Sequence, residues 1–233
     1  MITLLQNPNY LIGSQSSIEA LKTKHQARIL TVSDTHGAWR SLVRIVKQFG
    51  SDCDALILAG DCWRDLEELL ELADEDKEFC KVIPPVLAFV RGNGDPRAFP
   101  VTYDIGKNNP EARTQPKGTV LMPDSLILNV NGHNILLVHG HIEGVDFGYN
   151  KLGLDAKLQG AEYVIHGHTH VPILATRGDF TFINPGSVSR PRGGQPASFA
   201  ILTADDNFID TAFIRINDPF GDDSSYSIFN PLL

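Results

Sequence analysis

Cysteine, methionine and tryptophan are scarce in this chain, with three, two and two residues respectively among 233. Cys53, Cys62 and Cys80 form neither the even set that a disulfide framework needs nor a spacing typical of metal ligands. We therefore do not expect a disulfide-stabilised secreted domain or a thiolate metal site. Three unpaired thiols suit a reducing compartment.

Long hydrophobic runs are also missing. No stretch approaches the roughly 18 apolar residues of a membrane span, and residues 1–27 lack the basic start and apolar run of a signal peptide. We therefore expect a cytoplasmic protein that does not bind membranes. Residues 1–27 are interpreted as an N-terminal extension that packs on the surface or on a partner subunit.

Positive charge is in deficit, because 20 Lys and Arg face 28 Asp and Glu, giving a net charge of −8. The sequence contains no basic run, so a surface for extended nucleic acid is not expected, although metal ions could hold a small nucleotide. The hydrophobic content of 42% and the charged content of 21% are ordinary for a globular domain with a sizeable core.

The first half of the chain alternates apolar strands with amphipathic helices. Strands are predicted at 28–32, 54–59 and 86–90, and helices at 39–49 and 66–79. Polar residues follow every strand, so this order predicts a parallel sheet with right-handed crossovers and all strand ends at one edge.

The second half predicts further strands and a single helix at 150–159. Asn131-Gly132 indicates a hairpin between strands at 126–130 and 134–138. The remaining strands are predicted at 163–165, 171–175, 180–183, 198–202 and 208–214, the last two completing a second sheet. Residues 99–118 indicate a surface excursion that could cover the site, and residues 217–233 a loosely held tail. We expect one α/β domain over residues 28–216, with two mixed sheets packed together and helices outside.

Metal-ligand side chains stand at five of these strand ends. They are Asp34 and His36, Asp61, Asn93, His139, and His168 with His170. Each has a structural alternative, such as a helix cap, a turn residue or a hydrogen-bonded strand-end histidine. Together they supply enough oxygen and imidazole ligands for two ions, and a carboxylate can bridge such a pair.

The motifs in which these residues lie resemble, in order, the five blocks of the calcineurin-like metallophosphoesterase superfamily. They are Asp34-Thr35-His36, Gly60-Asp61, Gly92-Asn93-Gly94-Asp95, His139-Gly140-His141 and Gly167-His168-Thr169-His170. The resemblance covers residues 28 to about 203 and is greatest to the small bacterial and archaeal phosphodiesterase branch, in particular at Asn184-Pro185-Gly186-Ser187. It implies a four-layer α/β/β/α sandwich.

The resemblance also implies a ligand set for two divalent metal ions. One ion would be held by Asp34, His36, Asp61 and His170, and the other by Asp61, Asn93, His139 and His168. Asp61 would bridge them. Mn²⁺ is our first choice because the ligands combine oxygen and imidazole without thiolate, and Fe, Zn, Co or Ni would also be accepted.

The implied activity is hydrolysis of a small phosphodiester by a hydroxide that bridges the two metal ions, with Asp61, Asn93 and His141 as the catalytic residues. Many members of the family read Gly-Asn-His-Asp in the third block, and that histidine is thought to protonate the leaving oxygen. This chain has Gly94 there, which leaves Asp95 without its usual partner, so either His141 substitutes or the leaving group needs little protonation. The phosphodiesterase branch commonly lacks that histidine too.

Two alternatives stay open. The chain could be a phosphomonoesterase, or a non-catalytic metal-binding scaffold like the retromer subunit that shares this fold.

The resemblance suggests a homodimer or higher homo-oligomer. Four loop arginines could hold phosphate and two aromatic residues could stack on a base, although ordinary surface or core positions are the more common explanation. They are Arg91, Arg97, Arg190 and Arg192, and Trp39 and Phe99.

Overall fold

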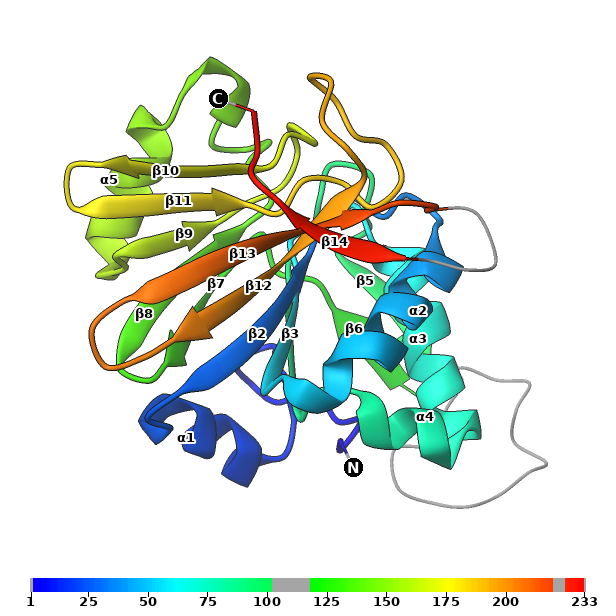
Figure 1. Cartoon of the computed structure of the whole chain (residues 1–233). Helices are drawn as coiled ribbons and strands as arrows, with labels where there is room; N and C mark the ends of the chain where they lie inside the picture. Colours follow the sequence, from blue (N-terminus) through cyan, green and yellow to red (C-terminus); the bar gives the residue numbers. More distant parts are fainter. Residues whose placement is uncertain (1, 102–117, 220–224, 233) are drawn as a thin grey trace.

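Two β-sheets pack face to face in the computed structural model, with helices on both outer faces (Figure 1). The structure describes residues 2–101, 118–219 and 225–232. Helices α2 (Trp39–Phe49), α3 (Trp63–Glu75) and α4 (Lys77–Val82) cover one sheet, and α5 (Asn150–Gln159) covers the other. This is the expected α/β/β/α sandwich.

The larger sheet has seven strands, of which β2, β3 and β4 run parallel. Their order is β1 (Ile12–Gly13), β4 (Val86–Phe89), β3 (Ala55–Leu58), β2 (Ala27–Val32), β12 (Ser198–Ala204), β13 (Ile209–Ile216) and β14 (Tyr226–Phe229).

The smaller sheet has five strands, and β8, β9 and β11 run parallel in it. Their order is β10 (Ile173–Arg177), β11 (Phe180–Asn184), β9 (Tyr163–Ile165), β8 (His133–Val138) and β7 (Ser125–Val130). β7 and β8 form the predicted hairpin, with Asn131 and Gly132 both at positive φ as this turn requires. A separate hairpin joins β5 (Ala98–Val101) to β6 (Gly118–Leu121).

Both faces of the central strands are buried, which explains why they are apolar throughout. Alternate residues of a strand point to opposite faces, so in β2 Leu30 packs under the helices while Ile29 packs between the sheets. In β8, Leu137 likewise faces the other sheet and Leu136 faces α5.

The predicted helix at 66–79 is two helices, α3 and α4. Asp76 separates them because its backbone is extended and its carboxylate accepts hydrogen bonds from the amides of Glu78 and Phe79. The acidic residue that seemed to extend one helix therefore caps the next.

The prediction that the last two strands complete the second sheet is wrong. β12 pairs antiparallel with β2, so β12 and β13 extend the first sheet. The chain crosses back from one sheet to the other through Pro185-Gly186-Ser187, which lies between β11 and β12. An apolar strand buried on both faces fits either sheet, so its pattern alone did not decide the pairing.

The described residues near both ends of the chain form more regular structure than expected. Residues 12–23, interpreted as part of a surface arm, instead supply β1, which pairs with β4, and α1 (Gln15–Thr23), whose Ile18 and Leu21 enter the core between the sheets. Within the expected tail at 217–233, β14 pairs with β13. Most of the predicted excursion lies outside the described residues. None of the helices described is long and apolar enough to cross a membrane.

Candidate metal centre

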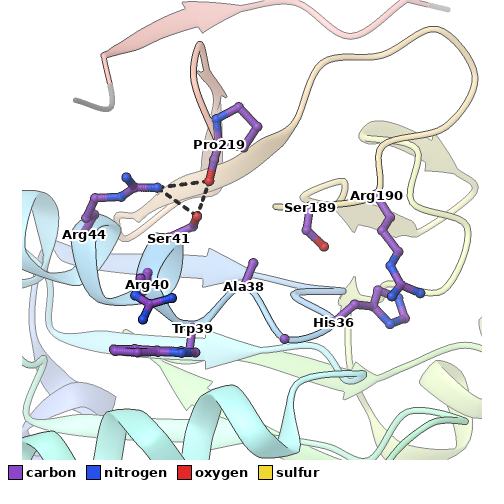
Figure 2. A pocket seen from close by; sticks show the side chains of 10 residues that line it. His36, Ala38, Trp39, Arg40, Ser41, Arg44, Ser189, Arg190 and Pro219 are labelled. Atoms are coloured by element: carbon purple, nitrogen blue, oxygen red, sulfur yellow. Dashed lines mark hydrogen bonds between the residues drawn. The ribbon is translucent and has the colours of Figure 1, made fainter. Parts of the chain in front are cut away.

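The predicted metal ligands meet at one edge of the sandwich. Loops after β2, β3 and β4 carry those of the larger sheet, and loops after β8 and β9 carry those of the smaller sheet. Open α/β sheets bind ligands at the carboxyl ends of their strands. His36 lines a cavity of about 400 Å³ beside this edge (Figure 2).

The backbone at this edge is unusual. Seven non-glycine residues in the described part of the chain have positive φ, a conformation that side chains rarely adopt. Five of these seven are predicted ligands, namely Asp34, His36, Asp61, His168 and His170. Such residues persist only where the surroundings hold them in place, and they concentrate at functional sites.

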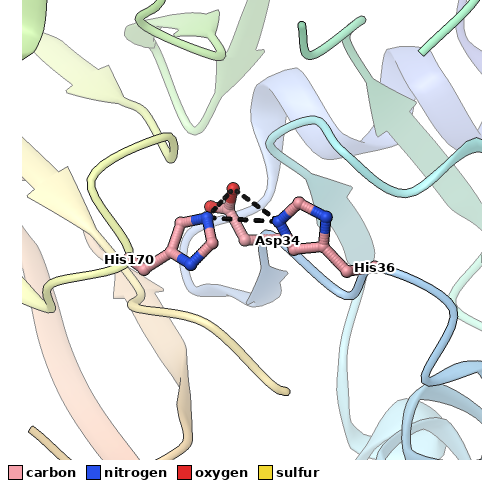
Figure 3. A group of neighbouring side chains, drawn as sticks. All are labelled: Asp34, His36 and His170. Carbon is pink, nitrogen blue, oxygen red and sulfur yellow. Dashed lines mark hydrogen bonds and ion pairs between the residues drawn. The ribbon is translucent and has the colours of Figure 1, made fainter. Parts of the chain in front are cut away.

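One group of ligand atoms consists of Asp34, His36 and His170 (Figure 3). Nε2 of His170 lies 3.1 Å from Oδ1 of Asp34 and 3.2 Å from Nε2 of His36. Nε2 of His36 lies 3.8 Å from the same carboxylate oxygen. One oxygen and two ring nitrogens therefore face a common point.

A second group consists of Asp34, Asp61 and His139. Nε2 of His139 lies 3.9 Å from Oδ1 of Asp34 and 3.8 Å from Oδ2 of Asp61. The same Asp61 oxygen lies 3.6 Å from Nε2 of His36 in the first group. Asp34 is thus common to both groups. The family resemblance implies Asp61 as the bridge, and its Oδ2 lies near His36 of the first group and His139 of the second.

The two remaining predicted ligands, Asn93 and His168, contact each other. Nδ1 of His168 lies 3.0 Å from Oδ1 of Asn93, and the ring centre of His168 lies 5.2 Å from that of His139. The backbone amide of His168 also donates to Oδ2 of Asp34. The structure therefore brings all seven predicted ligands to one place.

Hydrogen bonds hold two of the imidazoles in a ligand-ready tautomer. Nδ1 of His139 lies 2.7 Å from the carbonyl of Ala59, and Nδ1 of His170 lies 2.6 Å from that of Arg190. Because a carbonyl can only accept, Nδ1 carries the proton in both rings. Nε2 of a neutral ring then keeps the lone pair that a metal needs.

Asp146, in the short helix η3 (Val145–Phe147), contacts His168 but was not among the predicted site residues. Its Oδ2 lies 2.9 Å from Nε2 of His168, which leaves Nδ1 facing Asn93. Asp65 was also missed: it accepts hydrogen bonds from the hydroxyl of Thr35 and the amide of Gly37, on either side of His36. In the sequence, both residues are visible only as acidic residues a few positions after a motif, and acidic residues are common on protein surfaces.

The donor atoms fit a pair of divalent ions. Oδ1 of Asp34 and Nε2 of His139 are buried and have no hydrogen-bond partner among the described residues. Burial alone would raise the pKa of Asp34, but the neighbouring imidazoles of His170, whose Nε2 lies 3.1 Å from Oδ1, and of His139 lower it. Burial would lower the pKa of His170, and Asp34 instead raises it. A buried carboxylate that depends on its histidines for charge compensation is a site that attracts cations.

Gly94 and Asp95 have structural roles that the motif did not reveal. Asp95 accepts hydrogen bonds from the amides of Cys62 and Trp63, and so caps the start of α3. The amide of Gly94 donates to Oδ1 of Asp61 at 2.7 Å. Asp95 therefore has a structural role without a histidine partner, and Gly94 orients the carboxylate of Asp61.

His141 lies beside two of the predicted ligands, whereas His166 is buried away from solvent. The ring of His141 lies 5.3 Å from that of His139 and 6.2 Å from that of His168, and burial lowers its pKa. His166 is fully buried, and burial lowers its pKa to about 4. Its Nδ1 lies 3.3 Å from Nδ2 of Asn184, which indicates a structural role.

Of the arginine and aromatic residues suggested as phosphate or base contacts, some line a cavity at the site and others have a structural role. Arg91 and Arg97 both pair with Asp124, whose pKa the hydrogen bond from Arg91 lowers. Arg190 instead lines two cavities together with His36. Phe99 is buried in the core, whereas Trp39 lines the larger of these cavities.

Comparisons with known proteins identify the family of the chain. A model of the calcineurin-like phosphoesterase superfamily domain matches residues 28–207. Phosphodiesterase YfcE of Escherichia coli (strain K12) is 30% identical over 190 residues, covering 76% of this chain and 88% of the relative. Probable metallophosphoesterase YsnB of Bacillus subtilis (strain 168) is 26% identical over 195 residues, covering 84% and 93%.

Solved structures show the same fold. A predicted phosphoesterase from Streptococcus pneumoniae TIGR4 superposes with a TM-score of 0.57 at 21% identity, covering 88% of this chain and 98% of the other. Vacuolar Protein Sorting 29 from Cryptosporidium parvum gives 0.59 at 16% identity, covering 88% and 99%. The chain therefore belongs to the calcineurin-like phosphoesterase superfamily and is a metal-dependent phosphoesterase.

Proposed function

We propose that this chain is a dinuclear metal-dependent phosphodiesterase that hydrolyses a small phosphodiester. The observation that carries the proposal is the pair of overlapping ligand groups that share Asp34. Two of their atoms, Oδ1 of Asp34 and Nε2 of His139, are buried without a hydrogen-bond partner among the described residues. Such atoms are costly to bury unless something binds them.

The seven predicted ligands would hold the two ions. When bound, divalent ions at such a site neutralise the phosphate and lower the pKa of the attacking water. The protein itself fixes the donor atoms: carbonyls orient His139 and His170, Asp146 orients His168, and the amide of Gly94 orients Asp61.

His141 is the proposed proton donor to the leaving oxygen. Its ring lies beside those of His139 and His168, and its Nδ1 is buried. Nε2 is therefore the atom available to a substrate. A general acid is needed when the leaving group is poor, and this chain has Gly94 where many family members carry a histidine.

Mn²⁺ remains our proposed metal, because the donor set is oxygen and imidazole throughout. Cys62, although next to Asp61 in the sequence, is not part of either ligand group. All three cysteines are buried and free, which suits the reducing cytoplasm in which we propose that the protein works.

A small substrate suits the electrostatics better than an extended nucleic acid, since the chain carries a net charge of −8 and a phosphate backbone would be repelled.

We also propose a homodimer or higher homo-oligomer. Large apolar side chains stand exposed on η3 and α5, among them Phe147, Leu154 and Leu158. Light scattering on the purified protein measures the oligomeric state.

Hydrolysis of bis(p-nitrophenyl) phosphate, with and without Mn²⁺, tests the proposal. We expect metal-dependent turnover of this diester that exceeds turnover of p-nitrophenyl phosphate. The name of YfcE supports the diester, and the absence of a histidine at position 94 argues against broad monoesterase activity.

Two other results would contradict the proposal. Faster turnover of the monoester would identify a phosphomonoesterase. No turnover of any diester, with less than one bound ion per chain, would favour a scaffold, as the likeness in fold to Vacuolar Protein Sorting 29 allows.

A further inference from the structure

A cavity beside the metal centre has no role in the chemistry described so far. It has a volume of about 400 Å³ and lies between the start of α2 and the loop at Ser189 and Arg190 (Figure 2). We call it the arginine pocket. Its principal side chains are Trp39, Arg40, Ser41, Arg44, Ser189 and Arg190.

The arginine pocket adjoins the metal centre. His36, Gly37 and Arg190 line it, and the same three residues line a smaller cavity of about 220 Å³ that reaches Asp61 and Gly94. The arginine pocket therefore lies next to the position that a phosphate at the predicted ligands would occupy, on the other side of His36.

The lining of the arginine pocket is positive in an otherwise acidic protein. Arg40, Arg44 and Arg190 contribute three positive charges, and no Asp or Glu is among the described residues that line it. Within the described part of the chain, none of the three arginines forms an ion pair with a carboxylate. Three uncompensated guanidinium groups around one cavity select an anion.

The orientation of Arg40 favours an anion over a nucleobase. Its guanidinium lies over the ring of Trp39, 4.7 Å from the ring centre. Figure 2 shows this group on the pocket side of the indole ring. A base therefore cannot stack on that face, while the N–H groups at the edge of a stacked guanidinium stay available to phosphate oxygens.

Arg44 is fixed in place and keeps an unused donor. Its Nη2 donates to the hydroxyl of Ser41 and to the carbonyl of Pro219, both at 3.0 Å. Its Nε is buried without a hydrogen-bond partner among the described residues. The start of α2 adds to the positive potential, because its first turn has no acidic residue and Ala38 provides no side-chain cap.

We propose that the arginine pocket binds a second phosphate group of the same substrate molecule. The proposal rests on the proposed function and narrows its substrate class to phosphodiesters that carry a further phosphate on one of the esterified groups. The cavity is in the size range of small-molecule sites, so it accepts a phosphorylated sugar or nucleoside and not merely an inorganic ion.

Dinucleotides that differ only in a terminal phosphate test this proposal. The probes are thymidylyl-(3′→5′)-thymidine and the same compound phosphorylated at its 5′ or its 3′ end, each with Mn²⁺. We expect kcat/KM for at least one phosphorylated probe to exceed that of the unphosphorylated one by roughly tenfold, as one charge-assisted contact allows.

Variants then show whether the pocket causes the preference. Both Arg40 and Arg190 have exposed side chains, so the double variant R40Q/R190Q should fold. We expect it to bring the ratio of phosphorylated to unphosphorylated rates close to one. Arg177→Gln, an exposed arginine on β10 outside the arginine pocket, is the matched control and should keep the wild-type ratio.

Each contrary result has its own meaning. Equal rates on all three probes, with the diester still hydrolysed, would overturn the second-phosphate assignment and leave the proposed function standing. An unchanged preference in R40Q/R190Q would overturn the role of the pocket. Activation of the unphosphorylated probe by added inorganic phosphate would identify an effector site and overturn the assignment to substrate. No hydrolysis of any diester would overturn the proposed function and this inference with it.

Discussion

At the level of single residues, neighbouring groups of the protein orient the donor atoms. His139 and His170 each donate Nδ1–H to a backbone carbonyl, and Ser33 donates to Oδ2 of Asp34, which leaves Oδ1 for the centre. Backbone carbonyls cannot rotate away as solvated side chains do. The geometry of the centre therefore depends on neighbours that are not ligands themselves.

Replacing His139 by Ala tests the ligand set most directly. The imidazole is buried, so no water can easily take its place with the same geometry, and Asp61, Asn93 and His168 would leave one ion under-coordinated. We expect loss of one of the two ions by metal analysis and loss of nearly all turnover. His25→Ala, an exposed histidine away from the site, is the control. A fully active H139A variant would refute the assignment.

Replacing Asp146 by Ala tests the orientation of His168. Without the carboxylate at Nε2, the ring can rotate or take the other tautomer, so Nδ1 no longer faces Asn93 reliably. We expect metal affinity to fall by about 10–100-fold, as for other residues that orient metal ligands. Calorimetric titration with Mn²⁺ measures it. Asp179→Ala, in the exposed turn after β10, should bind as the wild type does, and equal affinities of D146A and D179A would contradict the role.

Gly94→His tests the argument about the leaving group. A Cβ at this position would lie 3.2 Å from Oδ1 of Asp61, so the neighbouring atoms must move by a few tenths of an ångström. We expect activity on p-nitrophenyl phosphate to rise relative to the diester, because an added imidazole can protonate a poorer leaving group. Gly94→Ala adds the same Cβ without the ring and serves as the control. If both variants keep the wild-type ratio, the leaving-group argument is wrong.

At the level of elements, short strands and short loops position the site. β3 and β4 have four residues each, and their ligands Asp61 and Asn93 follow within a few residues of the strand ends. Asp95 and Asp65 tie these loops to α3 and to the loop after β2 through backbone amides. The hydrogen bonds that cap the start of α3 therefore also hold the loops that carry the predicted ligands.

Replacing Asp76 by Ala tests the boundary between α3 and α4. The carboxylate accepts hydrogen bonds from the amides of Glu78 at 2.9 Å and Phe79 at 3.1 Å, so its loss should destabilise the fold by about 0.5–2 kcal/mol. Urea denaturation of the metal-free protein measures this loss. Asp74→Ala, on the exposed side of α3, should change stability by less than about 0.5 kcal/mol. Equal stabilities of D76A and D74A would favour one continuous helix.

The elements also show which features the sequence could reveal. The motif residues at strand ends were predictable because a ligand type, a strand and a turn coincide there. The sheet to which β12 belongs was not, because an apolar strand buried on both faces carries no mark of its neighbours. Asp146 was also missed, since its contact with His168 depends on how the loop after β8 folds back.

For the whole molecule, the metal centre exists only when the two sheets are packed together. Loops of the larger sheet supply Asp34, His36, Asp61 and Asn93, and loops of the smaller sheet supply the three remaining histidines. Apolar contacts between the sheets therefore hold the two halves of the site in register. The N-terminal segment takes part in this packing: α1 contacts β7, and its carbonyls at Leu21 and Lys22 accept hydrogen bonds from the turn between β7 and β8.

The double variant I18A/L21A tests whether the N-terminal segment belongs to the core. Both side chains are almost fully buried between the sheets, with exposed fractions of 4% and 2%, so each truncation should cost about 2–5 kcal/mol. We expect a large fall in the denaturation midpoint of the metal-free protein. Because α1 lies at the β7–β8 turn, away from the end of β8 that carries His139, the folded variant should still bind its full set of ions. Leu5→Ala, at a side chain that is 46% exposed, is the control. A change below about 0.5 kcal/mol for I18A/L21A would instead show that this segment only packs on the surface, as the sequence suggested.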